Sequence, residues 1–348
     1  MATRTTRLTA TLAGALTVLV VTACGSGTTA TRPPDVAATA SAPVVRAAAP
    51  ELRAGRLAQV AVSVATLWRS PDAPRPVDAP ALTRPVHIER WLANLTTEER
   101  RALNGRADTQ ALLGDRVRVV RLRPHWAKVV VPDQPTPLDA RGYPGWVPRR
   151  QLTAVRPVRT ERVATVVERT AWLRTDDQAA SPLLRVSLGT RLPLAGTSRR
   201  FAEVHLPDGA VRRIARSAVV LHDRDAPAVA PTRPSLVAVA TSFTGLDYLW
   251  AGASGFGVDC SGLTWLTYRV HGIRIPRDAS AQAAAGRAVE RPRSGDLLFF
   301  GNPVHHVAMS VGHSRMVHAP GTGQVVQTVP TSTPPFGGEY VGARRLLP

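Results

Sequence analysis

The sequence predicts an α+β protein in which two small β-barrels precede a C-terminal domain of mixed helix and sheet. Between residues 51 and 230, short runs of alternating apolar and polar residues are separated by turn residues, which is typical of short, half-buried strands. From residue 231 onward, helical stretches come first and β-like runs follow. The length of 348 residues suits several units that each bury a core.

Residues 1–23 have the composition of a targeting segment. A basic start with two arginines is followed by an uncharged, largely apolar run over residues 8–21, which is too short for a membrane-spanning helix. The run ends in Val-Thr-Ala-Cys24, which resembles the lipobox of bacterial lipoproteins. We therefore expect export, cleavage before Cys24 and lipidation of its thiol. A plain secretory signal followed by an accidental cysteine is the alternative.

Residues 24–50 consist largely of Thr, Ala, Ser and Pro, and predict a flexible tether. The sequence has two cysteines, Cys24 and Cys260. If lipid occupies the first thiol, no internal disulfide can form. An unpaired Cys260 in an exported protein then calls for a functional explanation.

Residues 51–155 predict a first barrel with a helical insert. The insert is marked by Thr96 three residues before Glu99, which is a capping-box spacing, and by Asn104-Gly105 as a stop signal. The strand-like stretches of this barrel lie at 60–64, 115–120, 125–131 and 145–148.

Residues 156–230 predict a second small barrel and a linker into the last domain. The strand-like stretches lie at 163–167, 183–186, 202–206 and 218–221, and prolines mark the linker from about residue 226. The last domain, residues 231–348, predicts helices at 236–243 and 260–270. Its β-like runs lie at 296–301, 307–311, 316–318 and 325–329.

The formal net charge is +19, and arginine supplies nearly all of it because Lys128 is the only lysine. This composition is typical of a GC-rich genome, so part of the charge reflects codon usage. Nucleic-acid binding is not expected, since no basic run with interleaved aromatics marks a groove. Attraction to anionic polymers or to a membrane surface fits the charge better.

Cys260 lies in the first turn of a predicted helix. Asp259 is a natural N-cap, and the amphipathic stretch that follows stops at His271-Gly272. The partial positive charge of a helix start favours thiolate over thiol, so Cys260 is a candidate nucleophile. The alternative is a buried, inert cysteine.

A nucleophilic thiol needs a base and a group that orients the base. Strand alternation puts His306, Ala308 and Ser310 on one face. If the chain turns back through residues 312–314, His318 falls opposite Ala308, on the same face as His306. This register requires an odd number of loop residues, since a two-residue turn would place His318 on the wrong face. The alternative for either histidine is an exposed surface position with no functional role.

The ordered motifs of the last domain resemble those of the NlpC-type cysteine peptidases, which are papain-fold enzymes that hydrolyse peptidoglycan stem peptides. The matching segments are Tyr248-x-Trp250, Asp259-Cys260-Ser261-Gly262, Pro276-Arg277-Asp278-Ala279-Ser280-x-Gln282, Gly295-Asp296-Leu297, His306-Val307 and His318-Ala319-Pro320-Gly321. The resemblance implies that Cys260 is the nucleophile, His306 the general base and acid, and His318 the residue that orients His306. It also places Tyr248 beside the sulfur and the Cys260 backbone N–H at the oxyanion. Ala251 departs from the glycine usual in the family.

The first barrel resembles the bacterial SH3-like barrel of the γ-D-glutamyl dipeptidyl-peptidase branch, through Thr109 to Asp115, residues 126–134, and Gly142 to Pro148. In that branch the barrel leans over the active site. The resemblance implies that Asp108, Tyr143 and Asp259 hold the free amine of an N-terminal L-alanine. The family usually has Glu at the position of Asp108. Candidate contacts to the D-glutamyl or diamino-acid part are Ser261, Arg277 and Ser280.

The sequence thus predicts a lipid-anchored cysteine peptidase on the outer face of the cytoplasmic membrane. Its expected substrates are peptidoglycan stem peptides or muropeptides, cut after the γ-D-glutamyl residue, and no cofactor is expected. Three alternatives remain: a zinc site built from Cys260, His306 and His318, an enzyme that cuts intact, glycan-linked wall, and a catalytically silent wall-binding lipoprotein. The third residue of the substrate, diaminopimelate or lysine, is not predicted.

Overall fold

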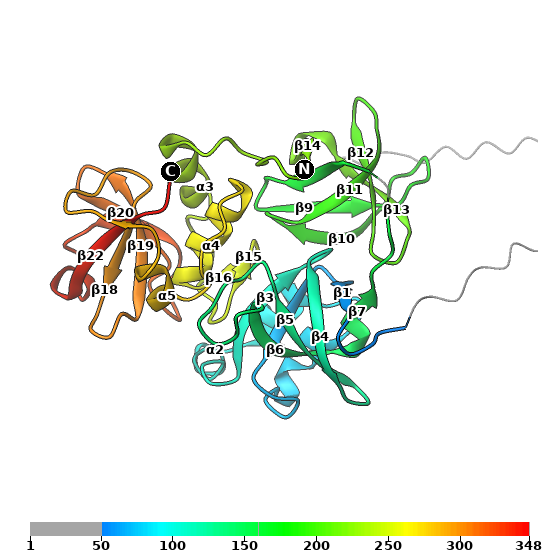
Figure 1. The fold of residues 1–348 in the computed structure, drawn as a ribbon, viewed down its shortest axis with the longest axis horizontal. Helices are drawn as coiled ribbons and strands as arrows, with labels where there is room; N and C mark the ends of the chain where they lie inside the picture. The colour runs from blue at the N-terminus through cyan, green and yellow to red at the C-terminus, as the bar shows by residue number, and fades with distance from the viewer. Residues whose placement is uncertain (1–50, 159, 348) are drawn as a thin grey trace, which may run out of the picture. The chain divides into compact units, whose positions relative to one another are not determined.

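The computed structural model describes residues 51–158 and 160–347 (Figure 1). The predicted signal segment, the tether and Cys24 lie outside the described residues, so they stay predictions. Two β-rich units are followed by a domain of mixed helix and sheet, which confirms the predicted α+β class. Among the described residues, no helix has the length and apolar character needed to cross a bilayer.

The first barrel is a seven-stranded antiparallel sheet in the order β3-β2-β6-β5-β4-β1-β7. The stretch 60–64, predicted as one strand, is the junction of two, because the chain changes partners there. β1 pairs with β4 and β7, whereas β2 pairs with β3 and β6. The strands are β1 (Leu57–Val60), β2 (Val64–Trp68), β3 (Ala107–Leu112), β4 (Arg116–Leu122), β5 (Trp126–Val131), β6 (Tyr143–Pro148) and β7 (Leu152–Ala154).

The helical insert lies between β2 and β3. It contains η1 (Pro76–Leu82), α1 (Ile88–Asn94) and α2 (Thr97–Arg101). The predicted capping box at Thr96 and Glu99 is present at the start of α2. Trp91 of α1 packs on Trp68 with ring centroids 6.1 Å apart, so the insert is fixed to the barrel through a buried aromatic pair.

The second barrel has the strand order β10-β9-β13-β12-β11-β8-β14. The sequence analysis missed β9, β11 and β13. β11 contains Pro193 and Gly196, and β13 has Arg212 and Arg213 in succession, which weakens the apolar alternation of these two strands. The strands are β8 (Arg162–Val166), β9 (Thr170–Arg174), β10 (Pro182–Ser187), β11 (Arg191–Thr197), β12 (Phe201–His205), β13 (Val211–Ala215) and β14 (Val219–Asp223). Short 3-10 turns follow β6 (η2, Arg149–Gln151) and β13 (η3, Arg216–Ala218).

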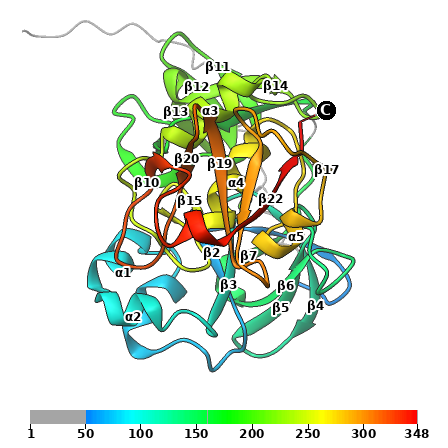
Figure 2. The ribbon, with the colours of Figure 1, turned by 90° about the vertical axis from the view of Figure 1, so that its left-hand side faces the viewer.

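The C-terminal domain places α3 and α4 on one face of a six-stranded sheet ordered β17-β22-β18-β19-β20-β21 (Figure 2). The central helix α4 packs on β19, and α3 packs on α4. The helices are α3 (Arg233–Thr241), α4 (Cys260–Val270), α5 (Ala279–Ala283) and η4 (Phe336–Glu339). The strands are the hairpin β15 (Ala253–Ser254) and β16 (Gly257–Val258), then β17 (Arg287–Ala288), β18 (Leu297–Phe300), β19 (His306–Gly312), β20 (Arg315–His318), β21 (Gln327–Pro330) and β22 (Tyr340–Arg345).

Two apolar clusters cover the two faces of this sheet. Val307 and Met309 of β19 pack toward α4 in the main core. Ala308 packs on the other face with Phe300, and the half-buried Phe336 covers that cluster. The alternation predicted for β19 is therefore present, and His306 begins the strand at the edge of both clusters.

Candidate active site

Cys260 is the first residue of α4 and is buried, with 8% of its surface exposed. Asp259 caps the helix as predicted, accepting a 2.7 Å hydrogen bond from the Gly262 backbone N–H. A Cβ on Gly262 would lie 2.0 Å from the Gly252 carbonyl oxygen. Glycine at that position therefore lets the preceding loop approach the helix start closely.

Burial and, to a lesser extent, the charge of Asp259 raise the pKa of the Cys260 thiol to about 12. Hydrogen bonds from the Val307 and Ser261 backbone N–H groups act in the opposite direction. The expectation that the helix start favours thiolate is therefore wrong for the resting protein. Desolvation of the charged form outweighs the helix dipole, and the sulfur rests as a thiol.

His306 and His318 lie on the same side of the sheet, in contact with each other. Nε2 of His306 is 3.0 Å from Nδ1 of His318, and the two rings are nearly perpendicular. The Val307 backbone N–H that reaches the sulfur belongs to the residue after His306, so Cys260 lies close to the backbone at the start of β19. Because His318 occupies Nε2 of His306, Nδ1 is the remaining ring nitrogen that can accept a proton.

The register that unites the two histidines is the predicted one, but the turn that produces it is not. The loop has two residues, His313 and Ser314, whose φ values of 51° and 53° are those of a hairpin turn with two left-handed positions. Val311 is an extra residue in a bulge on β19. With the two loop residues it makes an odd number of unpaired residues, so His318 lies on the same face as His306. The paired residues are Met309 with Val317, Ser310 with Met316, and Gly312 with Arg315.

Both imidazoles are neutral near pH 7. Burial lowers the pKa of His306 to about 3 and that of His318 to about 4, and the neighbouring ring contributes to the shift of His306. A neutral His306 can accept a proton from the neutral thiol. The pair therefore rests uncharged, and charge separates only during the reaction.

Tyr248 is buried, and its predicted place beside the sulfur stays a prediction. Burial raises the pKa of its hydroxyl, and the charge of Asp259 contributes to the increase. Ala251 has a φ of 65°, in the left-handed region. The glycine usual at this position is thus explained by backbone conformation, and alanine adopts the same conformation at a cost.

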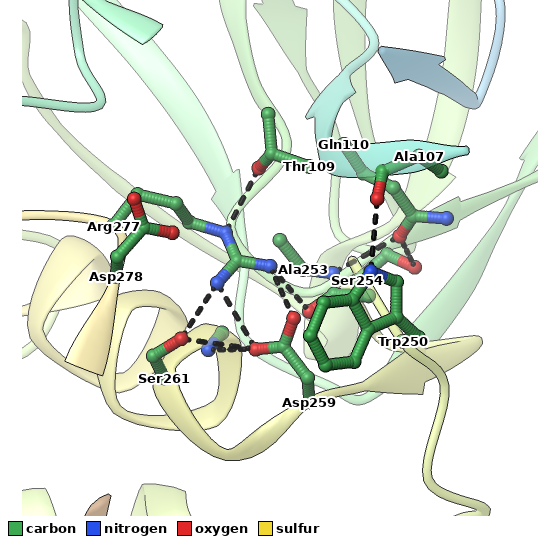
Figure 3. Close-up of polar contacts among 12 residues, drawn as sticks. Ala107, Thr109, Gln110, Trp250, Ala253, Ser254, Asp259, Ser261, Arg277 and Asp278 are labelled. Atoms are coloured by element: carbon green, nitrogen blue, oxygen red, sulfur yellow. Dashed lines mark hydrogen bonds and ion pairs between the residues drawn. The ribbon is translucent and has the colours of Figure 1, made fainter. Parts of the chain in front are cut away.

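Arg277 is 1% exposed and has no free donor (Figure 3). Its five N–H groups donate to Thr109 Oγ1, both carboxylate oxygens of Asp259, Ser261 Oγ and the Gly252 carbonyl. The protein thus uses all five donors of this guanidinium, and the predicted contact of Arg277 to substrate stays a prediction. Ser261, in turn, donates its hydroxyl proton to Asp259. Ser280 is exposed on α5, and its predicted role stays a prediction.

Acidic side chains gather where the first barrel meets the catalytic domain. Asp108 is paired with Arg69 at 2.7 Å, and the Tyr143 hydroxyl donates to Asp278 at 3.2 Å. Burial, followed by the charges of Asp278 and Asp108, raises the pKa of Tyr143. Asp259 keeps acceptor capacity, because its Oδ2 receives one hydrogen bond, from Arg277.

Asp278 was missed as a site residue. Its signal was present in the sequence, since it follows Arg277 directly and occupies the N-cap position of α5. Burial raises the pKa of Asp278, whereas the charge of Arg277 lowers it. With Asp108 and Asp259 it makes three carboxylates against the two guanidiniums of Arg69 and Arg277, a formal excess of one negative charge.

The first barrel is fixed to the catalytic domain by buried hydrogen bonds next to Asp108 (Figure 3). The Trp250 indole donates to the Ala107 carbonyl at 2.9 Å. Gln110 Oε1 accepts from the Ala253 N–H and the Ser254 hydroxyl. Residues on both sides of Asp108 in β3 thus contact the catalytic domain, which sets the position of its carboxylate.

Comparison with known proteins agrees with this geometry. The NlpC/P60 family matches residues 245–345, and the YKFC SH3b2 domain matches residues 166–221. A gamma-D-glutamyl-L-lysine dipeptidyl-peptidase of Bacillus cereus is 40% identical over 299 residues, covering 82% of this chain and 90% of the relative. The chain belongs to the NlpC/P60 family.

Two further comparisons extend the match across the domains. A gamma-D-glutamyl-L-lysine dipeptidyl-peptidase of Bacillus subtilis is 34% identical over 297 residues, covering 82% of this chain and 97% of the relative. A crystal structure of an NlpC/P60 family protein from Bacillus cereus aligns with a TM-score of 0.80 and 39% identity, covering 84% of this chain and 100% of that chain. This NlpC/P60 protein is therefore a cysteine peptidase with SH3-like barrels before its catalytic domain.

The zinc alternative requires Cys260, His306 and His318 to be arranged as ligands of one metal ion. Within residues 51–158 and 160–347, no group of three or more His, Cys, Asp or Glu side chains is arranged to hold a metal ion. His306 and His318 instead hydrogen-bond each other through Nε2 and Nδ1.

Proposed function

We propose that this enzyme hydrolyses the γ-D-glutamyl–diamino acid bond of peptidoglycan stem peptides that carry a free N-terminal L-alanine. The observation that carries the proposal is the cluster of Asp108, Asp259, Asp278 and Tyr143 beside the thiol. An excess of carboxylate at a partly buried seam favours an ammonium group. The names of the Bacillus relatives, which specify the γ-D-glutamyl-L-lysine bond, agree with this class of substrate.

In the proposed mechanism, the Cys260 thiol gives its proton to Nδ1 of His306 as the sulfur attacks the carbonyl carbon. The resulting oxyanion lies near the start of α4, where the Cys260 backbone N–H can donate to it. His306 then protonates the leaving amine, and a thioester remains on Cys260. Water, deprotonated by His306, hydrolyses the thioester and restores the thiol.

His318 acts through His306 in this scheme. A hydrogen bond from Nε2–H of His306 to Nδ1 of His318 selects the tautomer in which Nδ1 of His306 is unprotonated and able to accept the thiol proton. The same bond stabilises the imidazolium that forms during attack.

The test compares hydrolysis of free L-Ala-γ-D-Glu-L-Lys with that of the same peptide acetylated at its amine. We expect the free peptide to be cut and the blocked peptide to be cut at least about a hundredfold more slowly, since a buried carboxylate loses its charged partner. Asp108→Asn should narrow this difference, and Cys260→Ala should abolish both activities. Equal turnover of both peptides, or cleavage of intact glycan-linked wall at the same rate, contradicts the free-amine requirement. Dipeptide release by Cys260→Ala contradicts catalysis by this thiol.

We also propose that the chain is exported and anchored through a lipid on Cys24, on the basis of the Val-Thr-Ala-Cys segment. Metabolic labelling with a fatty acid should mark the wild-type protein and leave Cys24→Ser unlabelled. Unlabelled wild-type protein recovered in the medium would contradict the anchor.

A further inference from the structure

Phe336 stacks on the ring of His306. The ring centroids are 4.1 Å apart and the planes differ by 24°. Phe336 and His318 meet edge to face, with ring centroids 5.1 Å apart and planes that differ by 85°. One aromatic side chain therefore contacts both imidazoles, although it lies in η4, a segment that none of the recognised motifs includes.

The position of Phe336 is fixed by the sheet and by its own loop. Phe300 is fully buried and pairs with His306 on one side and Tyr340 on the other. It packs against Phe336 with ring centroids 5.8 Å apart. The loop is held by hydrogen bonds from Gly337 N–H to the Thr333 carbonyl and from Gly301 N–H to the Glu339 carbonyl.

The stack restricts the catalytic ring in two ways. It blocks rotation of the imidazole out of the plane in which Nε2 meets His318 and Nδ1 stays available. It also keeps water from one face of a ring whose pKa is lowered to about 3 by burial. When His306 takes up the thiol proton, the aromatic face can stabilise the new positive charge without competing for either ring N–H.

We propose that Phe336 is a positioning residue for His306, which holds the imidazole plane for proton transfer and supports its transient cation. This inference rests on the proposed function, because it assigns His306 as the base. It predicts that an aromatic face, rather than apolar volume alone, is required at this position.

The first experiment compares Phe336→Leu with Phe336→Tyr in hydrolysis of L-Ala-γ-D-Glu-L-Lys. Leucine keeps an apolar side chain but removes the aromatic face, so kcat should fall on the order of tenfold with KM within about twofold. Tyrosine keeps the face and should retain kcat within about twofold. Tyr340→Leu is the matched control, because Tyr340 packs on Phe300 and is 45% exposed.

A second variant moves Phe336 without removing it. A Cβ on Gly337 would lie 2.4 Å from the Ser332 carbonyl oxygen, so Gly337→Ala must shift the loop. A Cβ on Gly338 meets nothing within 4 Å, so Gly338→Ala is its control. We expect Gly337→Ala to lower kcat by about the same factor as Phe336→Leu. We expect Gly338→Ala to keep the kcat of the wild type.

Two readouts separate this inference from the proposed function. The rate at which iodoacetamide alkylates Cys260 reports proton transfer to His306 without any peptide substrate, and should fall in Phe336→Leu by the same factor as kcat. The pKa of His306, measured with isotope-labelled histidine, should rise in Phe336→Ala because water regains the exposed ring face. If the wild type fails to cut the peptide, the proposed function fails while the alkylation rates still test Phe336.

The inference would be overturned if Phe336→Leu had the same kcat and the same alkylation rate as the wild type. Equal losses in Phe336→Leu and Phe336→Tyr would also overturn it, because they would indicate a requirement for packing volume alone.

Discussion

Arg277 of the catalytic domain binds both carboxylate oxygens of Asp259, at 2.7 and 3.0 Å, and also donates to Thr109 of the first barrel. One fully buried guanidinium thus links the helix cap beside the nucleophile to the neighbouring domain. The N-cap of α4, the group of acidic side chains and the contact between the first barrel and the catalytic domain therefore all involve Arg277.

Replacing Arg277 by methionine should therefore leave Asp259 as an uncompensated buried charge. We expect a loss of about 3–5 kcal/mol in the free energy of unfolding, together with a large loss of kcat. Chemical denaturation measures the first quantity and peptide hydrolysis the second. Arg291→Met is the control, since Arg291 is exposed. Unchanged stability in Arg277→Met would show that the ion pair is dispensable.

His318 should affect the rate of chemistry rather than substrate binding. In His318→Ala the tautomer and orientation of His306 are no longer fixed, so kcat should fall by roughly 10²–10⁴-fold with little change in KM. His318→Asn can still accept a hydrogen bond and should recover part of the loss. His305→Gln serves as the comparison, because His305 is adjacent in sequence but has a 57% exposed side chain. A loss in KM alone would argue against an orienting role.

The raised pKa of Cys260 predicts the pH dependence of its alkylation. Below a pKa of about 12 the thiol dominates, so the thiolate fraction and the alkylation rate should increase continuously as pH rises through neutrality. A stable thiolate–imidazolium pair would instead give a constant rate between about pH 5 and pH 8. Mass spectrometry of iodoacetamide-treated protein distinguishes the two, and such a plateau would refute the neutral resting pair.

Ala251 offers a test of backbone strain beside the site. Its φ of 65° costs an alanine roughly 1–2 kcal/mol, and glycine removes this cost while losing about 0.5–1 kcal/mol of chain entropy. Ala251→Gly should therefore raise the free energy of unfolding by about 0.5–1 kcal/mol with catalysis retained. Ala253→Gly, at a fully buried strand position, should lower it. A destabilised Ala251→Gly would mean that the Cβ contacts outweigh the strain.

The sequence by itself determined the local features of the site. Asp259 before Cys260 specifies a capped helix start, because the cap forms within three residues. The alternation in β19 specifies which residues share a face with His306, because strand side chains have a period of two. These features depend on neighbouring residues and could be predicted without coordinates.

Only the tertiary structure decided how these features work together. The use of all five Arg277 donors, the resting state of the Cys260 thiol and the Phe336 stack depend on residues far apart in the chain. The bulge at Val311, which puts His318 on the face of His306, is a feature of the folded hairpin that the alternation did not reveal. Burial and donor saturation are properties of the packed molecule, so the raised pKa of the thiol and the internal hydrogen bonds of Arg277 could not be predicted from local pattern. The position of Phe336 is set by pairing of distant strands, which no spacing in the sequence encodes.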